Sequence, residues 1–416
     1  MTSQLLHHCI ISLNQPFTPC QDDDKTSFIN DEATWSRLFR KLNSMSCVVS
    51  WYPKHSEIYC SNAPYCDRKF GGPDSLVYKD IPKPKPQHGQ VLIQIKAFGI
   101  NHAEMHMRRG EWAESTPVSG IECVGLVEAC PRGEFRVGTK VAALMGGMGR
   151  TINGSYAEYT CVPALNVASI ESELSWAKLA AIPETYATAW TCLFRNLELK
   201  EGQTILIRGA TSAFGQAAVK MAINAGAKVI ATTRNRERFP ILEALGVQRA
   251  EIEGPELFQR LPECKALDAV LDLVGNSTIM SSLDMLRRGG RACLAGWLGG
   301  LAPIPDFNPL LQMASGVYLT FFGSFVFGEP QFPLSDVPLQ DIAKQVAGGR
   351  LKAKPSRVFS FEDIREAHRW SFVVVNLQSS NHTASLSYRP CMHNESPYLS
   401  TSSYLPSLRS TPYQRS

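Results

Sequence analysis

The sequence predicts an α/β protein in which a doubly wound parallel sheet is joined to a smaller β-rich domain. From about residue 175, apolar runs of strand length alternate with segments of helical periodicity, which is typical of a parallel sheet covered by helices. Before that, from about residue 70, short apolar runs are separated by glycine-rich turns, as in a small barrel. The chain has 416 residues, enough for two or three domains.

The individual elements follow from these patterns. In the first half we expect strands over 91–98, 120–128 and 140–143. The parallel sheet is predicted from strands at 204–208, 228–232, 269–273 and 291–295, which alternate with helices near 215–225, 236–245, 255–261 and 277–288. Two more helices, 339–348 and 361–370, flank a strand near 357–360.

The turn after strand 204–208 is the strongest local signal. A strand, a turn of small residues, a helix and a second strand form one half of a dinucleotide-binding fold. The small residues let a pyrophosphate approach the backbone and the helix N-terminus. The three usual glycines would fall at Ala210, Ser212 and Gly215, and only the third is present, so a purely structural turn is the alternative. The candidate cofactor residues here are Gly209, Thr211, Ser212, Ala213, Phe214 and Gly215.

The next strand ends in Thr233 and Arg234, and Arg238 follows closely. An acidic residue at this place would bind the ribose hydroxyls of NAD, whereas a guanidinium suits the 2′-phosphate of NADP. The sequence therefore predicts NADPH as the cofactor, with these three residues among its ligands. A solvated, charged turn is the alternative.

Composition limits the classes of partner. The net charge is +4 without a basic block, so nucleic acid is not an expected partner. No apolar run reaches the roughly 18 residues of a membrane span, and the N-terminus does not have the form of a signal peptide. The twelve cysteines include no Cys-x-x-Cys pair, which favours reduced thiols in a cytoplasmic protein over a zinc or disulfide framework.

A family resemblance rests on several motifs in a fixed order. They are 81–86 (Ile-Pro-Lys-Pro-Lys-Pro), 91–104, Arg109-Gly, 154–159 (Gly-Ser-Tyr-Ala-Glu-Tyr), 179–190, 199–204, 272–276 and 288–292. Over roughly residues 70–370, the chain resembles the zinc-independent, quinone-oxidoreductase-like branch of the medium-chain dehydrogenase/reductase superfamily. The resemblance implies a GroES-like β-rich barrel domain with an inserted doubly wound (Rossmann) nucleotide-binding domain, and an active site in the cleft between them.

That resemblance divides the chain. It implies a substrate domain over 69–190 that resumes at 327–370, with the NADPH-binding domain over 191–326 between. Residues 1–68 show no sustained periodicity, and residues 371–416 are rich in serine, so we expect both to be disordered or to depart from the family pattern. Within the latter, 372–376 (Phe-Val-Val-Val-Asn) could substitute for the family's last strand.

The resemblance also points to site residues. Where zinc-dependent relatives have a cysteine and a histidine as ligands, this chain has Asn101 and the segment Gly120-Ile-Glu122, so no metal is expected. Asn101 is the first catalytic candidate, beside the nicotinamide, unless it only caps a turn. Tyr186 is a candidate proton donor, unless it packs in the core.

Further candidates are expected around the nicotinamide and at strand ends. Thr188 corresponds to a family threonine near the nicotinamide, with helix packing as the alternative. Val274 ends one parallel strand, and Gly296 and Trp297 end the next, where nucleotide folds place ligands. A packed indole is the alternative for Trp297.

The function implied is an NADPH-dependent reductase. Without a metal to polarise a carbonyl, suitable substrates are already activated: quinones and α,β-unsaturated carbonyls. An enoyl reductase of a secondary-metabolite pathway and a non-catalytic NADPH-binding relative remain alternatives, and a homodimer is left open.

Overall fold

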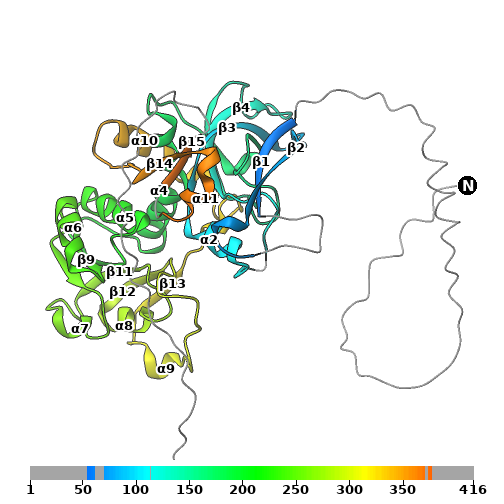
Figure 1. Ribbon diagram of the computed structural model, residues 1–416. Helices are drawn as coiled ribbons and strands as arrows, with labels where there is room; N and C mark the ends of the chain where they lie inside the picture. The colour runs from blue at the N-terminus through cyan, green and yellow to red at the C-terminus, as the bar shows by residue number, and fades with distance from the viewer. Residues whose placement is uncertain (1–53, 61–69, 113, 371–372, 377–416) are drawn as a thin grey trace, which may run out of the picture. The chain divides into compact units, whose positions relative to one another are not determined.

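The computed structural model describes residues 54–60, 70–112, 114–370 and 373–376. These residues fold around one parallel and one curled, mostly antiparallel sheet, as the ribbon in Figure 1 shows. The predicted fold class is thereby confirmed. The expectations of disorder for 1–53, 61–69 and 377–416 concern residues outside those described.

The parallel sheet has six strands in the order β10-β9-β8-β11-β12-β13. Every neighbouring pair is parallel. Numbered along the chain, this is the order 3-2-1-4-5-6 of a doubly wound nucleotide-binding fold, whose direction of winding reverses between β8 and β11. The strands are β8 (Thr204–Arg208), β9 (Lys228–Thr233), β10 (Arg249–Ile252), β11 (Leu267–Asp272), β12 (Leu286–Leu294) and β13 (Tyr318–Phe321).

Helices connect these strands and cover the sheet. They are α5 (Ala213–Asn224), α6 (Phe239–Leu245), α7 (Leu257–Arg260), α8 (Ile279–Asp284) and α9 (Pro309–Gln312). The central strands are apolar and buried on both faces, since helices lie on both sides. Near its start α5 packs unusually closely, because a Cβ added at Gly215 would lie 2.6 Å from the Cα of Ala210.

The second sheet has the strand order β14-β15-β3-β4-β5-β7, and β6 also pairs with β3. β1 and β2 form a separate antiparallel pair. The strands are β1 (Lys54–Cys60), β2 (Leu76–Pro82), β3 (Gln90–Ile100), β4 (Glu122–Ala129), β5 (Lys140–Leu144), β6 (Tyr159–Pro163), β7 (Val167–Ser169), β14 (Arg357–Ser360) and β15 (Val373–Asn376). Because β14 and β15 join strands from the first half of the chain, the late segment returns to this sheet, and the expected substitute strand is confirmed over 373–376, while residue 372 lies outside the described residues.

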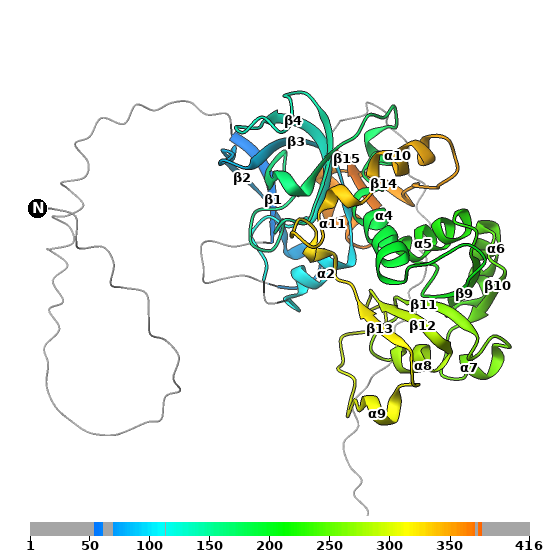
Figure 2. The same cartoon turned by 180° about the vertical axis from the view of Figure 1, so that it is seen from behind.

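Helix α4 (Pro183–Trp190) lies between the two sheets in both views (Figures 1 and 2). It contacts α5 of the parallel sheet and also β4 and β5 of the other sheet. Seven of its eight residues are buried, and it continues into a π-helical turn, Thr191–Asn196. The remaining helices are α2 (His102–Arg109), α3 (Trp176–Leu179), α10 (Leu339–Ala347) and α11 (Ile364–Ala367).

Some local expectations differ from the structure. The helix expected over 277–288 ends at Asp284, because β12 begins at Leu286 and pairs there with β11. The helix expected over 361–370 is only a 3₁₀ turn and the short α11. Strands β1, β2, β6, β7, β10 and β13 were not expected. They are short or polar, so their partners rather than their own periodicity define them.

Candidate active site

The carboxyl ends of β8 and β11 lie side by side where the winding of the parallel sheet reverses. This is the place at which open α/β sheets bind their ligands. The residues after β8 form the predicted small-residue turn. Gly209 has φ +73°, a left-handed conformation that favours glycine, and a Cβ there would meet the Leu298 side chain at 2.8 Å.

Helix α5 begins directly after this turn. Ser212 is its N-cap, and the Ser212 hydroxyl accepts a 3.0 Å hydrogen bond from the N–H of Gly215. The first N–H groups of a helix have no partner within the helix, so those of Ala213 and Phe214 are left to bind a ligand. Thr211, Ser212, Ala213 and Phe214 are all partly exposed, whereas Gly215 is buried. The structure thus brings the predicted turn residues together.

A network of buried polar side chains supports the small-residue turn after β8. The Arg208 guanidinium, at the end of β8, forms an ion pair with Glu253, and the two side chains are 1% and 7% exposed. Thr232 on β9 also donates to Glu253, at 2.7 Å. On the other side, Arg208 donates to Ser282, whose hydroxyl donates to Asp272 at 2.7 Å. Because every charge has a partner, this network fixes the strand ends of β8, β9 and β11 relative to one another.

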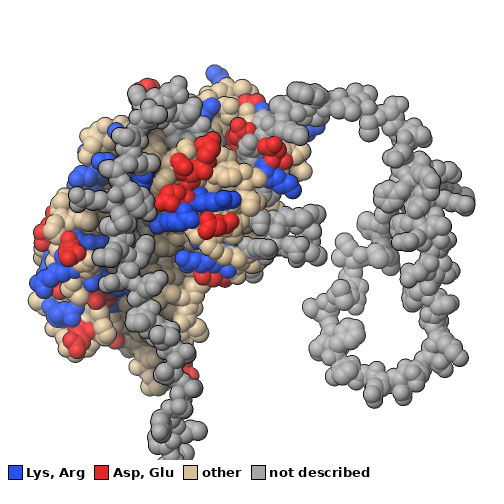
Figure 3. All heavy atoms as spheres, viewed as in Figure 1, with Lys and Arg blue, Asp and Glu red and all other residues tan. Residues whose placement is uncertain are grey.

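The predicted phosphate ligands lie at the end of β9. The Thr233 side chain is buried and lies 3.4 Å from the hydroxyl of Thr211, so the two predicted segments meet. Arg234 and Arg238 are exposed. Neither guanidinium forms an ion pair with any residue in the described part of the chain. Figure 3 shows acidic and basic side chains interspersed over one face.

Two glycine-containing turns follow β11 and β12. Asp272 ends β11, and its carboxylate accepts hydrogen bonds from the N–H groups of Val274 and Gly275 at 2.9 and 3.0 Å. Gly275 has φ +110°, and a Cβ there would lie 2.9 Å from the carbonyl oxygen of Gly296. The predicted residues Val274 and Gly296 are therefore close together, and both are partly exposed.

Trp297 belongs to an aromatic rim, which we define as Trp297, Phe321 and Phe325. The ring centres of Trp297 and Phe321 are 5.8 Å apart, and those of Phe321 and Phe325 are 6.4 Å apart. Both phenylalanines are about half exposed. The Arg150 guanidinium, from the segment after β5, lies 5.2 Å from the Phe325 ring centre. The rim thus lies where the two halves of the molecule meet.

Asn101 is positioned by two glutamates. It is the N-cap of α2, and its backbone N–H donates to Glu104 at 2.8 Å. Its Nδ2 amide donates to Oε1 of Glu122, also at 2.8 Å. Glu122 extends toward Gly99, where a Cβ would lie 2.2 Å from Oε1, so only glycine leaves room for this carboxylate.

The carboxylate of Glu122 also accepts a hydrogen bond from α4. Oε2 of Glu122 accepts a 2.9 Å hydrogen bond from the backbone N–H of Glu184, in the first turn of that helix. The Glu184 side chain in turn accepts a 3.2 Å hydrogen bond from the hydroxyl of Thr188. The structure therefore connects two predicted site residues, Asn101 and Thr188, through two glutamates that the sequence analysis did not single out.

Burial shifts the titration of these carboxyls. It raises the pKa of Glu104 to about 7, that of Glu122 to about 8 and that of Glu184 to about 7. Interactions with Ser324 and with Thr188 oppose part of the shift at Glu184. Three raised carboxyls in one cluster are a signature of a functional site, although structural clusters also occur.

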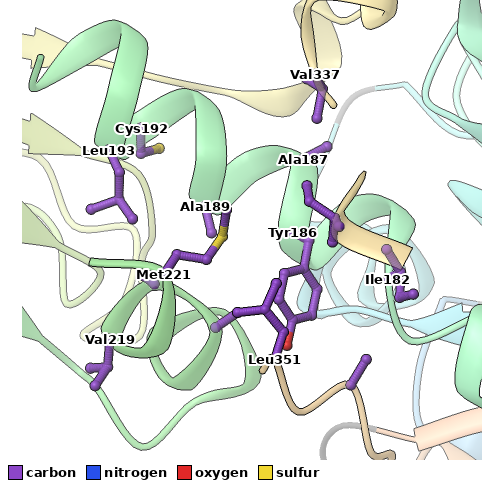
Figure 4. Close-up of a cluster of buried hydrophobic side chains, with 14 of the residues drawn as sticks. Ile182, Tyr186, Ala187, Ala189, Cys192, Leu193, Val219, Met221, Val337 and Leu351 are labelled. Atoms are coloured by element: carbon purple, nitrogen blue, oxygen red, sulfur yellow. The ribbon is translucent and has the colours of Figure 1, made fainter. Parts of the chain in front are cut away.

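Tyr186 lies elsewhere. It is only 2% exposed and packs in the hydrophobic core among Ile182, Met221 and Leu351 (Figure 4). Burial raises the pKa of its phenol further above the usual value of 10. These surroundings favour the alternative that Tyr186 packs in the core.

At the positions where the family resemblance implies metal ligands, this chain has other residues. Asn101 and Ile121 stand where zinc-dependent relatives have a cysteine and a histidine, and the backbone N–H of Ile121 donates to Glu104. Among the described residues, no group of three or more His, Cys, Asp or Glu side chains has the arrangement to hold a metal ion. The free thiols include Cys123, Cys130, Cys161, Cys192, Cys264 and Cys293. Within the same described ranges, none of the helices combines the length and apolar character needed to cross a bilayer.

Comparisons with known proteins identify both halves. Residues 87–172 match the alcohol dehydrogenase GroES-like domain, and residues 213–338 match the zinc-binding dehydrogenase domain. The quinone oxidoreductase of Lama guanicoe is 30% identical over 256 residues, which cover 58% of this chain and 73% of that protein. The human quinone oxidoreductase is 27% identical over 318 residues, covering 72% and 91%.

Solved structures agree on the fold. A mycobacterial protein, Rv1454c, solved in complex with NADPH, is 24% identical with a TM-score of 0.66, covering 78% of this chain and 100% of its own. The CurK enoyl reductase is 22% identical with a TM-score of 0.63, covering 78% and 99%. Together with the sequence relatives, these matches show that the chain is an oxidoreductase and belongs to the quinone-oxidoreductase-like branch of the medium-chain dehydrogenase/reductase superfamily.

Proposed function

We propose that this protein is a zinc-independent, NADPH-dependent reductase that transfers hydride to a quinone or an α,β-unsaturated carbonyl. The observation that carries the proposal is the small-residue turn at the reversal point of the parallel sheet. There Gly209 and Gly215 carry no side chain, and the first N–H groups of α5 have no partner within the helix. A pyrophosphate suits this turn, since the helix N-terminus favours negative charge.

The selectivity for NADPH would come from the end of β9. The exposed Arg234 guanidinium, with no ion-pair partner among the described residues, supplies a positive charge for a 2′-phosphate. The Thr233 and Thr211 hydroxyls lie beside it, and Arg238 adds a second exposed charge. No acidic residue ends this strand to favour the ribose hydroxyls of NAD instead.

Bound NADPH would supply a hydride from its nicotinamide. Val274, Gly296, Trp297 and Thr188 are the residues that would hold that ring. Asn101 would donate a hydrogen bond to the substrate oxygen, which gains charge during the transfer. Glu122 holds the Asn101 amide in place for this task. The aromatic rim offers planar apolar surface to a conjugated substrate.

One assay tests this proposal. Purified protein should oxidise NADPH in the presence of a simple quinone or of a conjugated enone, and should use NADH poorly. Tight NADPH binding without turnover on either substrate class would contradict the proposal and favour a non-catalytic relative. Turnover only on an acyl chain tethered to a carrier would instead favour the enoyl-reductase alternative.

We further propose that a second copy of this chain is the macromolecular partner. β13 is an edge strand of the parallel sheet, and Tyr318, Leu319 and Phe321 on it are exposed. The neighbouring α9 exposes Leu310 and Leu311 at 88% and 78%. An apolar edge of this kind invites pairing with another strand. Light scattering should give twice the mass of one chain, and a monomer at micromolar concentration would contradict this.

A further inference from the structure

Three buried carboxyl groups gather around the start of α4. Glu104 comes from α2, Glu122 from the first residue of β4 and Glu184 from the first turn of α4. Their exposed fractions are 0%, 3% and 9%. Besides burial, the charge of Glu184 raises the pKa of both Glu104 and Glu122, and the charge of Glu104 also raises that of Glu122. Three ionised groups so close together in a medium of low polarity are unfavourable, so the cluster retains at least one proton at neutral pH.

Hydrogen bonds locate that proton. Both oxygens of Glu104 accept backbone N–H groups, from Asn101 and Ile121. Both oxygens of Glu122 also accept hydrogen bonds, one from the Nδ2 amide of Asn101 and one from the backbone N–H of Glu184. These two carboxyls are therefore best satisfied when ionised.

Glu184 differs from the other two. Its Oε1 accepts the Thr188 hydroxyl, and its Oε2 is buried without a hydrogen bond of good geometry among the described residues, although the nearby Ser324 hydroxyl also lowers the pKa of this carboxyl. A buried, unpaired carboxylate oxygen is costly, whereas a protonated one is a donor that needs only an acceptor. The pKa of Glu122 is raised further, to about 8, but both of its oxygens accept N–H groups, so the hydrogen bonds favour Oε2 of Glu184 as the place of the proton.

The surroundings of Glu184 are those of the proposed site. Thr188 and, through Glu122, Asn101 lie on one side. Ser324, which interacts with Glu184, stands between Phe321 and Phe325 of the aromatic rim in the sequence. Other titratable groups near the carboxyl are Glu104, Glu122 and the buried thiol of Cys192.

We propose that Glu184 is the general acid that protonates the substrate after hydride transfer. The inference rests on the proposed function and extends it to a conjugated carbonyl substrate. The hydride brings two electrons to the β-carbon and leaves an enolate, whose oxygen is hydrogen-bonded by Asn101. The O–H bond at Oε2 of Glu184 then breaks, and a C–H bond forms at the α-carbon. Glu184 is left as a carboxylate and takes a new proton from water.

This step distinguishes enones from quinones. Protonation of carbon is slow and benefits from a placed acid, which typically contributes about 10²–10⁴-fold in rate. A reduced quinone carries its charge on oxygen, which water protonates readily. The acid is therefore needed for an enone and dispensable for a quinone.

The test is Glu184→Gln, which keeps an acceptor for Thr188 and removes the acidic proton. We expect kcat for an α-methyl enone to fall at least ~100-fold, whereas kcat for a quinone changes less than roughly 5-fold. The NADPH dissociation constant, from fluorescence titration, should stay within about twofold, because the substitution preserves the fold. The matched control, Glu173→Gln, changes an exposed glutamate outside the cluster and should behave as wild type.

Two measurements on the wild type complete the test. In D₂O, the wild type should add deuterium to the α-carbon of the product in a single configuration. The Glu184→Gln variant should give both configurations. Infrared spectra should show a protonated carboxyl at neutral pH that is absent from Glu184→Gln. If that variant does not fold, the wild-type product decides, because a racemic α-carbon would overturn the proposal.

The outcomes separate the two claims. Loss of enone but not quinone reduction supports the proton assignment. Unchanged enone turnover in Glu184→Gln overturns the assignment and leaves the reductase function standing. Failure of the wild type to reduce either substrate overturns the proposed function, and with it this step.

Discussion

The Nδ2 amide of Asn101 donates a 2.8 Å hydrogen bond to Oε1 of Glu122. Glu122 is buried and accepts a second hydrogen bond from the first turn of α4, so its carboxylate is itself fixed. The amide of Asn101 is thereby held in one orientation, and the other hydrogen on Nδ2 has no partner among the described residues. This is the geometry of a donor prepared for an oxygen that gains charge.

Asn101→Ala should therefore lower kcat much more than it weakens cofactor binding. A donor of this kind contributes about 3 kcal/mol, or ~10²-fold in rate. Steady-state kinetics and an NADPH titration measure the two effects. Asn224→Ala is the matched control, since Asn224 is exposed and bonds only the carbonyl of Arg350. If kcat holds while thermal stability falls, Asn101 only caps α2.

Arg234→Ala should weaken NADPH binding by about 1.5–3 kcal/mol, because it removes a charge-assisted contact to the 2′-phosphate. NADH, which has no such phosphate, should bind as before. Lys228→Ala removes the same charge at the opposite end of β9 and should affect neither cofactor. Equal losses of both cofactors in Arg234→Ala would show that the guanidinium has only a structural role.

Gly215→Ala should destabilise the start of α5. The new Cβ would lie 2.6–2.7 Å from backbone atoms of Ala210 and Gly209, which cannot move without displacing the turn. We expect a loss of about 1–3 kcal/mol in the free energy of unfolding, together with weaker NADPH binding. Gly254→Ala is the control, since nothing lies within 4 Å of its Cβ position. Equal stability of the two variants in denaturant titrations would refute the close-packing argument.

Activity should survive a strong chelator. Asn101 and Ile121 replace the expected zinc ligands, and both are already engaged by glutamates. Elemental analysis of the purified protein should find far less than one zinc per chain. Stoichiometric zinc that is lost together with activity would contradict the account.

The fold could be predicted because its signals are local and repeated. Strands β8, β9 and β11 are largely buried apolar runs, and the turn before Gly215 is built mainly of small residues. The strand β13 was missed because its four residues are too few to show a periodicity, and pairing with β12 defines it. Likewise, 286–288 was expected in a helix, but pairing with β11 begins at Leu286.

The candidate site was predicted only in part. The turn residues and Arg234 are close in sequence, so their placement follows from one strand–helix–strand unit. Glu122 and Glu184 are 62 residues apart, and their hydrogen bond depends on how α4 packs against β4. Glutamates on a helix and a strand are usually solvated, so nothing in their spacing indicated a buried cluster. The one residue in the sequence that relates to this cluster was Gly99, whose lack of a side chain makes room for the Glu122 carboxylate.

Transfer of deuterium from labelled NADPH tests the central claim most directly. The protein would be given NADPH carrying deuterium at the reactive carbon of the nicotinamide, together with a conjugated enone. The account predicts one deuterium at the β-carbon of the product for each NADPH oxidised. NADPH that binds but transfers no deuterium to any quinone or enone would contradict the assignment of this protein as a hydride-transferring reductase.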